Sequence, residues 1–455
     1  MKLPDELTPE CLADLSSRGP RYTSYPPATE FAPIEPTRVT SELARVRGDA
    51  APVSLYVHVP FCRSLCWYCG CNVIPSRDTS RGERYVDSLA TELALLVDVL
   101  GVGFPIAEVA LGGGSPNFLT PKSVRTLKTA IDRSFAIQPT ARLSVELDPR
   151  DTTGLQIDTF ADAGFRSLSV GVQDFSTRVQ DAIHRHQTLA QTGWLIERAR
   201  NAGFSDVNID IVYGLPRQHE SSFLGTLESI IGLAPDRIAL FGYAHLPDRL
   251  PHQRLVEKAG RVLDRYERAS LLLLGIEKLT DAGYIHLGLD HFAKPGSSLA
   301  RAAQQRRMVR TFQGYVEHRA DTIVGVGTSA ISSTPRMFWQ NFGELAPWED
   351  AIAAKRLPVQ RGAELDTDDR IRRTLIERLM CDGEADLDTL RQRYGIAPLD
   401  YFARELDVLA HEPELAVLDH HTIRTTPLGK LLVRNVCMMF DRYFHEDKSR
   451  FSSTI

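Results

Sequence analysis

Short apolar runs rich in β-branched residues recur along the first half of the chain, and each is followed by a stretch with helical periodicity. The six runs are VSLYVHV (53–59), EVALGGG (108–114), RLSVELDP (142–149), SLSVGVQ (167–173), VNIDIVYGLP (207–216) and RIALFGYAHL (237–246). Both faces of these runs are apolar, as in a parallel sheet that is covered by helices. Six βα units in series favour an α/β barrel, open or closed, and a doubly wound sheet is the alternative.

The stretches between the runs carry helix signals. Residues 81–100 are amphipathic, and Thr120 followed by Pro121 predicts the N-cap and first turn of the next helix. These features predict one α/β core over 51–330, preceded by an N-terminal arm (1–50) and followed by a connecting segment (331–365).

The pattern changes from residue 366 onward, where we predict a smaller, mainly helical domain (366–455). Three helices are expected, at 366–380, at 386–395 ending at Gly395, and at 398–410. Residues 415–432 predict a hairpin, or wing, that leads into a final helix. A winged-helix shape suggests DNA binding, but this segment has nearly as many acidic as basic residues. A lid or packing domain is therefore the favoured interpretation.

Composition narrows the class of protein. The 455 residues carry a formal net charge of −5 with both signs well mixed, so no nucleic-acid partner is expected. The polar start of the chain contains no apolar signal segment, and apolar runs such as Leu271–Leu274 are far too short to span a membrane. We therefore expect a cytoplasmic protein whose thiols stay reduced.

Polar residues cluster at the carboxyl ends of the predicted strands, where barrel enzymes build their active sites. They are the glycine run 112–114, Glu146 and Asp148, Gln173 and Asp174, Asn208 and Asp210, and Tyr243, Ala244 and His245. One shared ligand would explain them together, since buried polar groups need partners. The glycine run alone is a weak signal, because it lacks a Walker lysine and the Rossmann spacing.

Four of the seven cysteines lie in FCRSLCWYCGC (61–71). Reduced thiols argue against a disulfide hinge and for metal binding. Zinc sites usually combine two separated CxxC pairs, whereas Cys62, Cys66 and Cys69 form CxxxCxxC, which suits three corners of a [4Fe–4S] cluster. Cys11, Cys381 and Cys437 are expected to be small core residues.

CxxxCxxC after the first strand of an α/β barrel, with a glycine run after the second, resembles the radical S-adenosylmethionine (SAM) superfamily. That resemblance implies a partial (β/α) barrel and a [4Fe–4S] cluster with one iron left open for SAM. It also implies reductive cleavage of SAM to a 5′-deoxyadenosyl radical that abstracts hydrogen from substrate.

A narrower resemblance covers nearly the whole chain. RYTSYPPATEF (21–31), YVHVPFCRSLCWYCGCN (56–72), LGGGSP (111–116), VGVQDF (170–175), VNIDIVYGLP, YAHLP (243–247), DHFAKP (290–295), FQGY (312–315), GTSAIS (327–332) and VRNVCMMFDRYF (433–444) occur in this order. Together they resemble the oxygen-independent coproporphyrinogen III oxidases. The resemblance implies conversion of two propionates of coproporphyrinogen III to vinyl groups, giving protoporphyrinogen IX, and two bound SAM molecules.

The resemblance also assigns site residues. Cys62, Cys66 and Cys69 would ligate the cluster. Tyr56, Tyr68, Gly113, Glu146 and Ile331 would surround the first SAM, and Gly114, Ser115, Gln173, Arg185, Asp210 and Ala244 the second. Taken alone, Tyr56 reads as a core residue and Arg185 as part of a solvated helix start. Arg21 is a candidate to meet a substrate carboxylate.

Two departures from the family pattern stand out. VEHRAD (316–321) follows FQGY where the family usually has two threonines, and Ser115 ends the glycine motif. Glu317 would repel an anionic substrate unless His318 or Arg319 pairs with it. The alternatives are therefore a paralogue acting on another tetrapyrrole, a haem chaperone, or a zinc-stabilised structural protein. Expected partners are a tetrapyrrole substrate and a separate electron donor and acceptor, and a monomer is expected.

Overall fold

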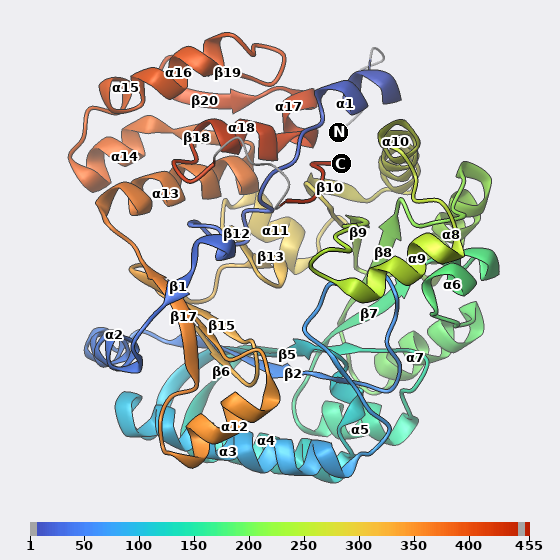
Figure 1. Cartoon of the computed structure of the whole chain (residues 1–455), viewed down its shortest axis with the longest axis vertical. Coiled ribbons are helices and arrows are strands. Elements are labelled where there is room, and N and C mark those ends of the chain that lie inside the picture. Colours follow the sequence, from blue (N-terminus) through green and yellow to red (C-terminus); the bar gives the residue numbers. More distant parts are fainter. Residues whose placement is uncertain (1–6, 445–450) are drawn as a thin grey trace.

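A thirteen-stranded sheet forms the centre of the molecule in the computed structural model, which describes residues 7–444 and 451–455 (Figure 1). Its strands in spatial order are β1 (Ala32–Pro33), β17 (Val359–Glu364), β16 (Met337–Asn341), β15 (Ile331–Ser333), β14 (Ile323–Val326), β2 (Val53–Val59), β5 (Phe104–Gly113), β6 (Phe135–Leu147), β7 (Ser167–Gln173), β8 (Asp206–Tyr213), β9 (Arg237–Gly242), β11 (His291–Ala293) and β10 (Ile285–Gly288). The sequence was expected to begin without a signal segment. Residues 1–6 of that beginning lie outside the described residues.

The six predicted strands are confirmed as β2, β5, β6, β7, β8 and β9, which pair in parallel in sequence order. Because this order never reverses, the sheet has no switch point and is not doubly wound. β14 adds a parallel strand next to β2 that the sequence pattern did not predict. The sheet ends at β1 and β10, which do not pair with each other, so the barrel is open.

Helices cover the outside of this curved sheet (Figure 1). In chain order they are α3 (Ser80–Leu100), α4 (Pro121–Ser134), α5 (Gly154–Asp162), α6 (Thr177–Ile183), α7 (Leu189–Asn201), α8 (Glu220–Leu233), α9 (Arg254–Ala259) and α10 (Arg265–Asp281). The predicted start of α4 is confirmed, since the Thr120 side chain accepts the N–H of Ser123 at 3.2 Å and Pro121 occupies the first turn. On α3, Leu89, Leu93 and Leu96 are buried, and each contributes about 1.5–3 kcal/mol of hydrophobic stabilisation.

One carboxylate is buried behind the sheet. Glu92 on α3 accepts hydrogen bonds from the Gly327 N–H at 2.7 Å, Asn341 Nδ2 at 2.7 Å and Trp348 Nε1 at 3.2 Å. Burial raises the pKa of Glu92 to about 7. These bonds hold the turn between β14 and β15, which leads into Ile331.

The segment 331–365, expected to connect two domains, continues the main sheet as β15, β16 and β17, with α12 (Leu345–Ala353) between the last two. The N-terminal arm contains α1 (Pro9–Leu15) and α2 (Pro36–Asp49), and its β1 pairs with β17. Within the arm Cys11 is exposed, so its prediction as a core residue is wrong, whereas Cys381 and Cys437 are buried as predicted. The division of the chain into domains stays a prediction.

The C-terminal part gathers at one end of the molecule, opposite α3 and α4 (Figure 1). Its elements are α13 (Thr367–Asp382), β18 (Glu384–Asp386), α14 (Leu387–Tyr394), α15 (Pro398–Tyr401), α16 (Ala403–Ala410), β19 (Ala416–Asp419), β20 (Thr422–Thr425), α17 (Pro427–Leu431) and α18 (Val433–Met439). The hairpin is confirmed by the pairing of β19 with β20. A single helix over 398–410 is wrong, because the chain leaves helical geometry at Phe402, whose ring is buried against Phe440.

Between the barrel and this C-terminal part lie α11 (Ser298–Gln304) and the hairpin of β12 (Met308–Thr311) with β13 (Gly314–Glu317). Among the described residues, no helix is long and apolar enough to cross a membrane.

Candidate active site

One cavity at the carboxyl ends of β2, β5, β6, β7 and β8 collects most of the predicted site residues. Those that line it are Cys62, Cys66, Tyr68, Cys69, Gly113, Gly114, Ser115, Glu146, Gln173, Arg185 and Asp210. They come from five successive strand ends, because parallel strands that follow one another in a sheet bring their carboxyl ends to the same edge. The polar residues expected at the ends of these strands thus share one cavity in part, since Asp174, Asn208, Tyr243, Ala244 and His245 do not line it.

The cysteine loop leaves β2 and closes on itself where β3 (Phe61–Cys62) pairs with β4 (Ile74–Pro75). All its thiols are free. The backbone N–H of Cys71 points at the sulfur of Cys69 over 3.4 Å. Cys71 thus lies beside the CxxxCxxC motif and orients one of its sulfurs.

Two arginines face the middle cysteine. Nη2 of Arg150 lies 3.5 Å and Nη1 of Arg185 lies 3.6 Å from the sulfur of Cys66. Asp148 accepts from both guanidinium groups, at 2.6 Å from Arg150 and 3.1 Å from Arg185. Burial opposes ionisation of Asp148, but Arg185 and then Arg150 outweigh it and lower its pKa to about 2. The group next to Cys66 therefore carries net positive charge, which suits a thiolate.

Arg185 is not a solvated residue at a helix start. It is 6% exposed, and its Nη2 donates to the Gly171 carbonyl at 2.5 Å. Its Nε is buried with no hydrogen-bond partner in the described part of the chain. A buried donor without a partner indicates that a ligand completes it.

The glycine run brings backbone against the cavity. Gly113 has φ +109°, and a Cβ there would come within 2.5 Å of the His58 ring. Its N–H donates to Glu146 Oε2 at 3.2 Å. A side chain at this position would therefore displace the His58 ring, and the positive φ also favours glycine. Ser115, which departs from the family pattern, donates to Asn117 Oδ1 at 2.5 Å.

Two further carboxylates line the cavity, of which Glu146 is exposed to it and Asp210 is half-buried. Loss of hydration within the cavity, followed by the charge of Asp210, raises the pKa of Glu146 to about 7. Asp210 accepts from Asn208 Nδ2 at 2.7 Å and Ser169 Oγ at 3.1 Å, and burial raises its pKa too. Neither carboxylate forms a salt bridge within the described ranges, so a cationic ligand is the partner that this pair lacks.

Three predicted residues do not line the cavity. The Tyr56 hydroxyl contacts His58 Nδ1 at 3.1 Å, and burial and then Glu146 raise its pKa. Ala244 is joined to Tyr68 by Gln253, whose Nε2 donates to both backbone carbonyls at 3.1 and 3.0 Å. Ile331 packs with Phe31, Phe338 and Leu365.

Sequence reasoning missed Arg150 and His58, and assigned Asp148 no role. Asp148 and Arg150 lie in LDPR, directly after a strand, and that position was the available signal. His58 bridges Tyr56 to the cysteine loop, since its Nε2 lies 3.1 Å from the Asn72 carbonyl. Its inward position on β2 would have been the signal.

The charged residues of VEHRAD (316–321) are paired with oppositely charged neighbours. Glu317 pairs with Arg319 at 2.8 Å, as anticipated, and also with Arg307 at 3.2 Å, while His318 pairs with Asp321 at 2.9 Å. Arg21 on the arm donates to the Gly242 carbonyl at 3.0 Å, at the carboxyl end of β9. The arm thus reaches the edge of the sheet that carries the site.

The comparisons with known proteins agree with this geometry. Residues 56–230 match the radical SAM superfamily and residues 365–432 match the HemN C-terminal domain. The chain is a radical SAM protein, a class that uses a [4Fe–4S] cluster and SAM.

Curated relatives narrow the class. The oxygen-independent coproporphyrinogen III oxidase of Pseudomonas aeruginosa is 36% identical over 97% of both chains, and that of Escherichia coli K12 is 36% identical over 94% of this chain and 93% of its own. The solved structure of coproporphyrinogen III oxidase (HemN) from Escherichia coli, titled a radical SAM enzyme, matches with a TM-score of 0.89, covering 93% of this chain and 98% of that one. The chain belongs to the family of oxygen-independent coproporphyrinogen III oxidases.

The cavity residues fit these cofactors. Four free thiols line the cavity, those of Cys62, Cys66, Cys69 and Cys71, and the first three form the CxxxCxxC donor set of a [4Fe–4S] cluster with an open iron. SAM carries a sulfonium, an ammonium and a carboxylate. The carboxylates of Glu146 and Asp210 complement its cationic groups, and the free Nε of Arg185 complements its carboxylate.

Proposed function

We propose that the chain catalyses the oxygen-independent oxidative decarboxylation of two propionates of coproporphyrinogen III to vinyl groups. The supporting observation is that the CxxxCxxC thiols, the glycine edge and an unpaired carboxylate pair line one cavity. They do so in a chain that is 36% identical, over nearly its full length, to oxidases with this name.

When bound, the cluster and SAM supply a 5′-deoxyadenosyl radical that removes a hydrogen atom from the propionate β-carbon. Cys62, Cys66 and Cys69 are the proposed ligands of the cluster. Arg150 and Arg185, held by Asp148, keep positive charge against the Cys66 sulfur.

Orientation of SAM is the proposed task of the cavity wall. Glu146, the Gly113 backbone, Asp210 and Arg185 all line the cavity. In this proposal they contact the SAM molecules, with Arg185 Nε available to a carboxylate. Tyr56, Ala244 and Ile331 act from behind the wall in this proposal, through His58, Gln253 and the turn held by Glu92 respectively.

The arm excludes water in this proposal. Arg21 bonds the Gly242 carbonyl, and Tyr22 donates to Asp441 Oδ2 at 3.0 Å, which ties the arm to the C-terminal part. Closing the site protects a radical from solvent and oxygen. We further propose that the protein acts as a cytoplasmic monomer that takes electrons from a separate donor and passes them to a separate acceptor.

An anaerobic assay tests the function. Protein with a reconstituted cluster is incubated with SAM, a reductant and coproporphyrinogen III, and mass spectrometry follows the products. Loss of two carbon dioxide molecules together with 5′-deoxyadenosine is expected, and Cys66→Ala serves as the inactive control. 5′-Deoxyadenosine without decarboxylation would reject the substrate but keep the radical chemistry. Haem binding without SAM cleavage would indicate a chaperone instead.

A further inference from the structure

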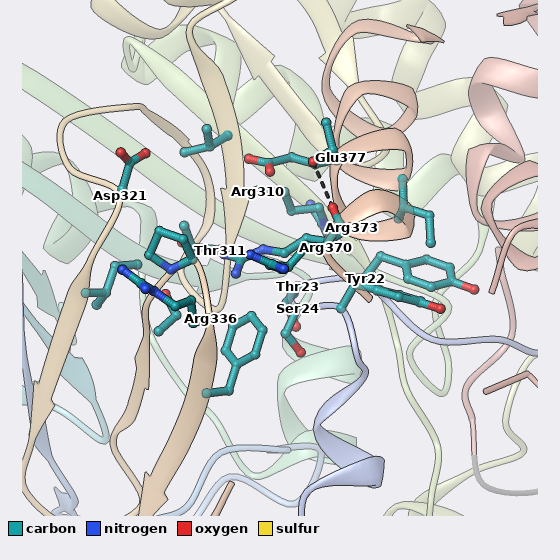
Figure 2. Close-up of a pocket in the computed structure, with 18 of the residues that line it drawn as sticks. Tyr22, Thr23, Ser24, Arg310, Thr311, Asp321, Arg336, Arg370, Arg373 and Glu377 are labelled. Atoms are coloured by element: carbon teal, nitrogen blue, oxygen red, sulfur yellow. Dashed lines mark hydrogen bonds between the residues drawn. The ribbon is translucent and has the colours of Figure 1, made fainter. Parts of the chain in front are cut away.

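A second cavity, of about 670 Å³, lies apart from the cysteine cavity, between the arm, the β12–β13 hairpin and α13 (Figure 2). Its volume falls in the range of small-molecule sites, which is roughly 300–1,000 Å³. Five arginines line it against two carboxylates, counting only the part of the chain that the structure describes. They are Arg310, Arg336, Arg370, Arg373 and Arg393, against Asp321 and Glu377.

The carboxylates neutralise little of this charge. Asp321 pairs with His318, and the ion pair of Glu377 is with Arg378, outside the cavity wall, at 3.8 Å. Arg373 has no salt bridge within residues 7–444 and 451–455. Its Nη1 donates to the Thr334 carbonyl at 2.8 Å. Arg310 pairs with Asp290 at 3.5 Å, and Arg336 pairs with Glu42 and with Asp49 at 3.9 Å. In the described part of the chain, the net positive charge of the cavity therefore lies on Arg370, Arg373 and Arg393.

Arg370 is similar, since it reaches only the Asp366 carbonyl at 3.3 Å and the Thr367 hydroxyl at 3.1 Å. In Figure 2 the guanidinium groups of Arg370 and Arg373 extend from α13 into the space above Thr23 and Ser24 of the arm, and Arg336 lies across from them. Guanidinium groups with spare donors that converge on one space are suited to bind several carboxylates.

Flat apolar surface accompanies the charge. Tyr25, Phe312, Phe338 and Tyr394 line the same cavity, and the guanidinium of Arg373 lies 4.7 Å from the centre of the Phe338 ring. Aromatic walls with separate cationic groups fit a large, flat molecule that carries several carboxylates.

The cavity borders the proposed SAM site. Ser333 lines it, and Ile331, assigned above to the first SAM, lies two residues earlier on β15. Residues i and i+2 of a strand share a face and are roughly 6.5 Å apart. Phe338 lines the cavity and also packs with Ile331.

The two cavities differ in charge. The cysteine cavity mixes both signs, with Glu146, Asp148 and Asp210 against Arg150 and Arg185. The arginine cavity has an excess of positive charge. Coproporphyrinogen III has four carboxylates, of which two remain in the product.

We infer that the arginine-lined cavity binds the tetrapyrrole, with Arg370 and Arg373 holding propionates that are not reacting at that moment. This inference rests on the proposed function and deepens it. It makes the C-terminal helix α13 part of the substrate site rather than only a packing element. Arg310 also lines the cavity, where its Nε donates to the Arg21 carbonyl at 3.0 Å and its Nη1 pairs with Asp290 at 3.5 Å.

The test compares Arg370→Gln and Arg373→Gln with the control Arg404→Gln, which removes an exposed charge from the same part of the chain and does not line the cavity. Binding of coproporphyrin III, the oxidised tetracarboxylate, is measured by fluorescence, and mesoporphyrin IX, with two carboxylates, is the second probe. Anaerobic turnover of coproporphyrinogen III then gives KM and kcat.

Each cavity variant should weaken coproporphyrin III binding and raise KM by about tenfold, and weaken mesoporphyrin IX binding less. Iron content and SAM affinity should stay as in the wild type. Arg373→Gln also removes the hydrogen bond to the Thr334 carbonyl and could disturb the local fold. Arg370→Gln leaves that bond in place and so tests the charge without that loss.

Unchanged Kd and KM in both variants, or an equal loss in Arg404→Gln, would overturn the inference while leaving the function intact. If the wild type does not convert coproporphyrinogen III, the proposed function fails. Porphyrin binding then decides the inference by itself: a loss confined to the cavity variants supports it, and no loss rejects it.

Discussion

Glu146→Gln tests the claim that the carboxylate pair binds SAM. Glu146 accepts one hydrogen bond, from the Gly113 N–H, and glutamine keeps an acceptor of the same shape there. The substitution therefore removes charge with little change in packing. Loss of one charge-assisted hydrogen bond costs about 1.5–3 kcal/mol, which corresponds to roughly 10- to 150-fold weaker SAM binding.

The pH dependence of SAM binding gives a second, independent test of the same claim. Since loss of hydration and Asp210 raise the pKa of Glu146 to about 7, the ionised form that binds a cation decreases as the pH falls through 7. If only the ionised form binds, the apparent Kd of the wild type rises about tenfold from pH 8 to pH 6. Glu146→Gln has no such group. Its apparent Kd should therefore not change with pH once both curves are corrected for the titration of SAM itself, which is the same for both proteins.

Equilibrium dialysis of labelled SAM against anaerobic, cluster-loaded protein at pH 6 to 8.5 measures both effects. Glu220→Gln, which removes an exposed carboxylate at the start of α8, is the charge-matched control. Equal Kd values and parallel pH curves for wild type and Glu146→Gln would refute the reasoning.

Three further changes probe other parts of the molecule. Cys66→Ala should abolish the cluster absorbance and all SAM cleavage, and retained cleavage would reject the ligand assignment. Glu92→Ala leaves three buried donors without an acceptor and should lower the free energy of unfolding in urea by more than about 3 kcal/mol. The loss should be larger at pH 5 than at pH 8, because a raised pKa makes the contribution of Glu92 decline as the pH rises from about 4.5 to 7, and a constant loss would contradict this. Replacing Val316 and Glu317 by threonine should change KM less than threefold, since Glu317 is already neutralised by two arginines; a tenfold fall in KM would show that the loop does repel substrate.

The cysteine motif and the strand ends were predictable because their information is local. Three thiols within eight residues must end on one loop whatever the rest of the chain does. Short apolar runs rich in β-branched residues form strands because of local geometry. Sequential βα units then place their carboxyl ends at one edge, so Glu146 and Asp210 could be grouped before any coordinates. The break at Phe402 could not be predicted, because burial of its ring against Phe440 decided it against local helix propensity.

The sequence by itself thus determined the six central strands, the cysteine motif and most of the residues that line the cavity, each through short-range patterns. Only the tertiary structure decided how these residues pair. It buried Arg185 beside Cys66 and left its Nε free, it neutralised Glu317, and it joined the arm to α13 around one basic cavity. The contacts between the arm and α13 join positions about 350 residues apart in the sequence. Charges at that separation meet only because packing of the whole core places them together.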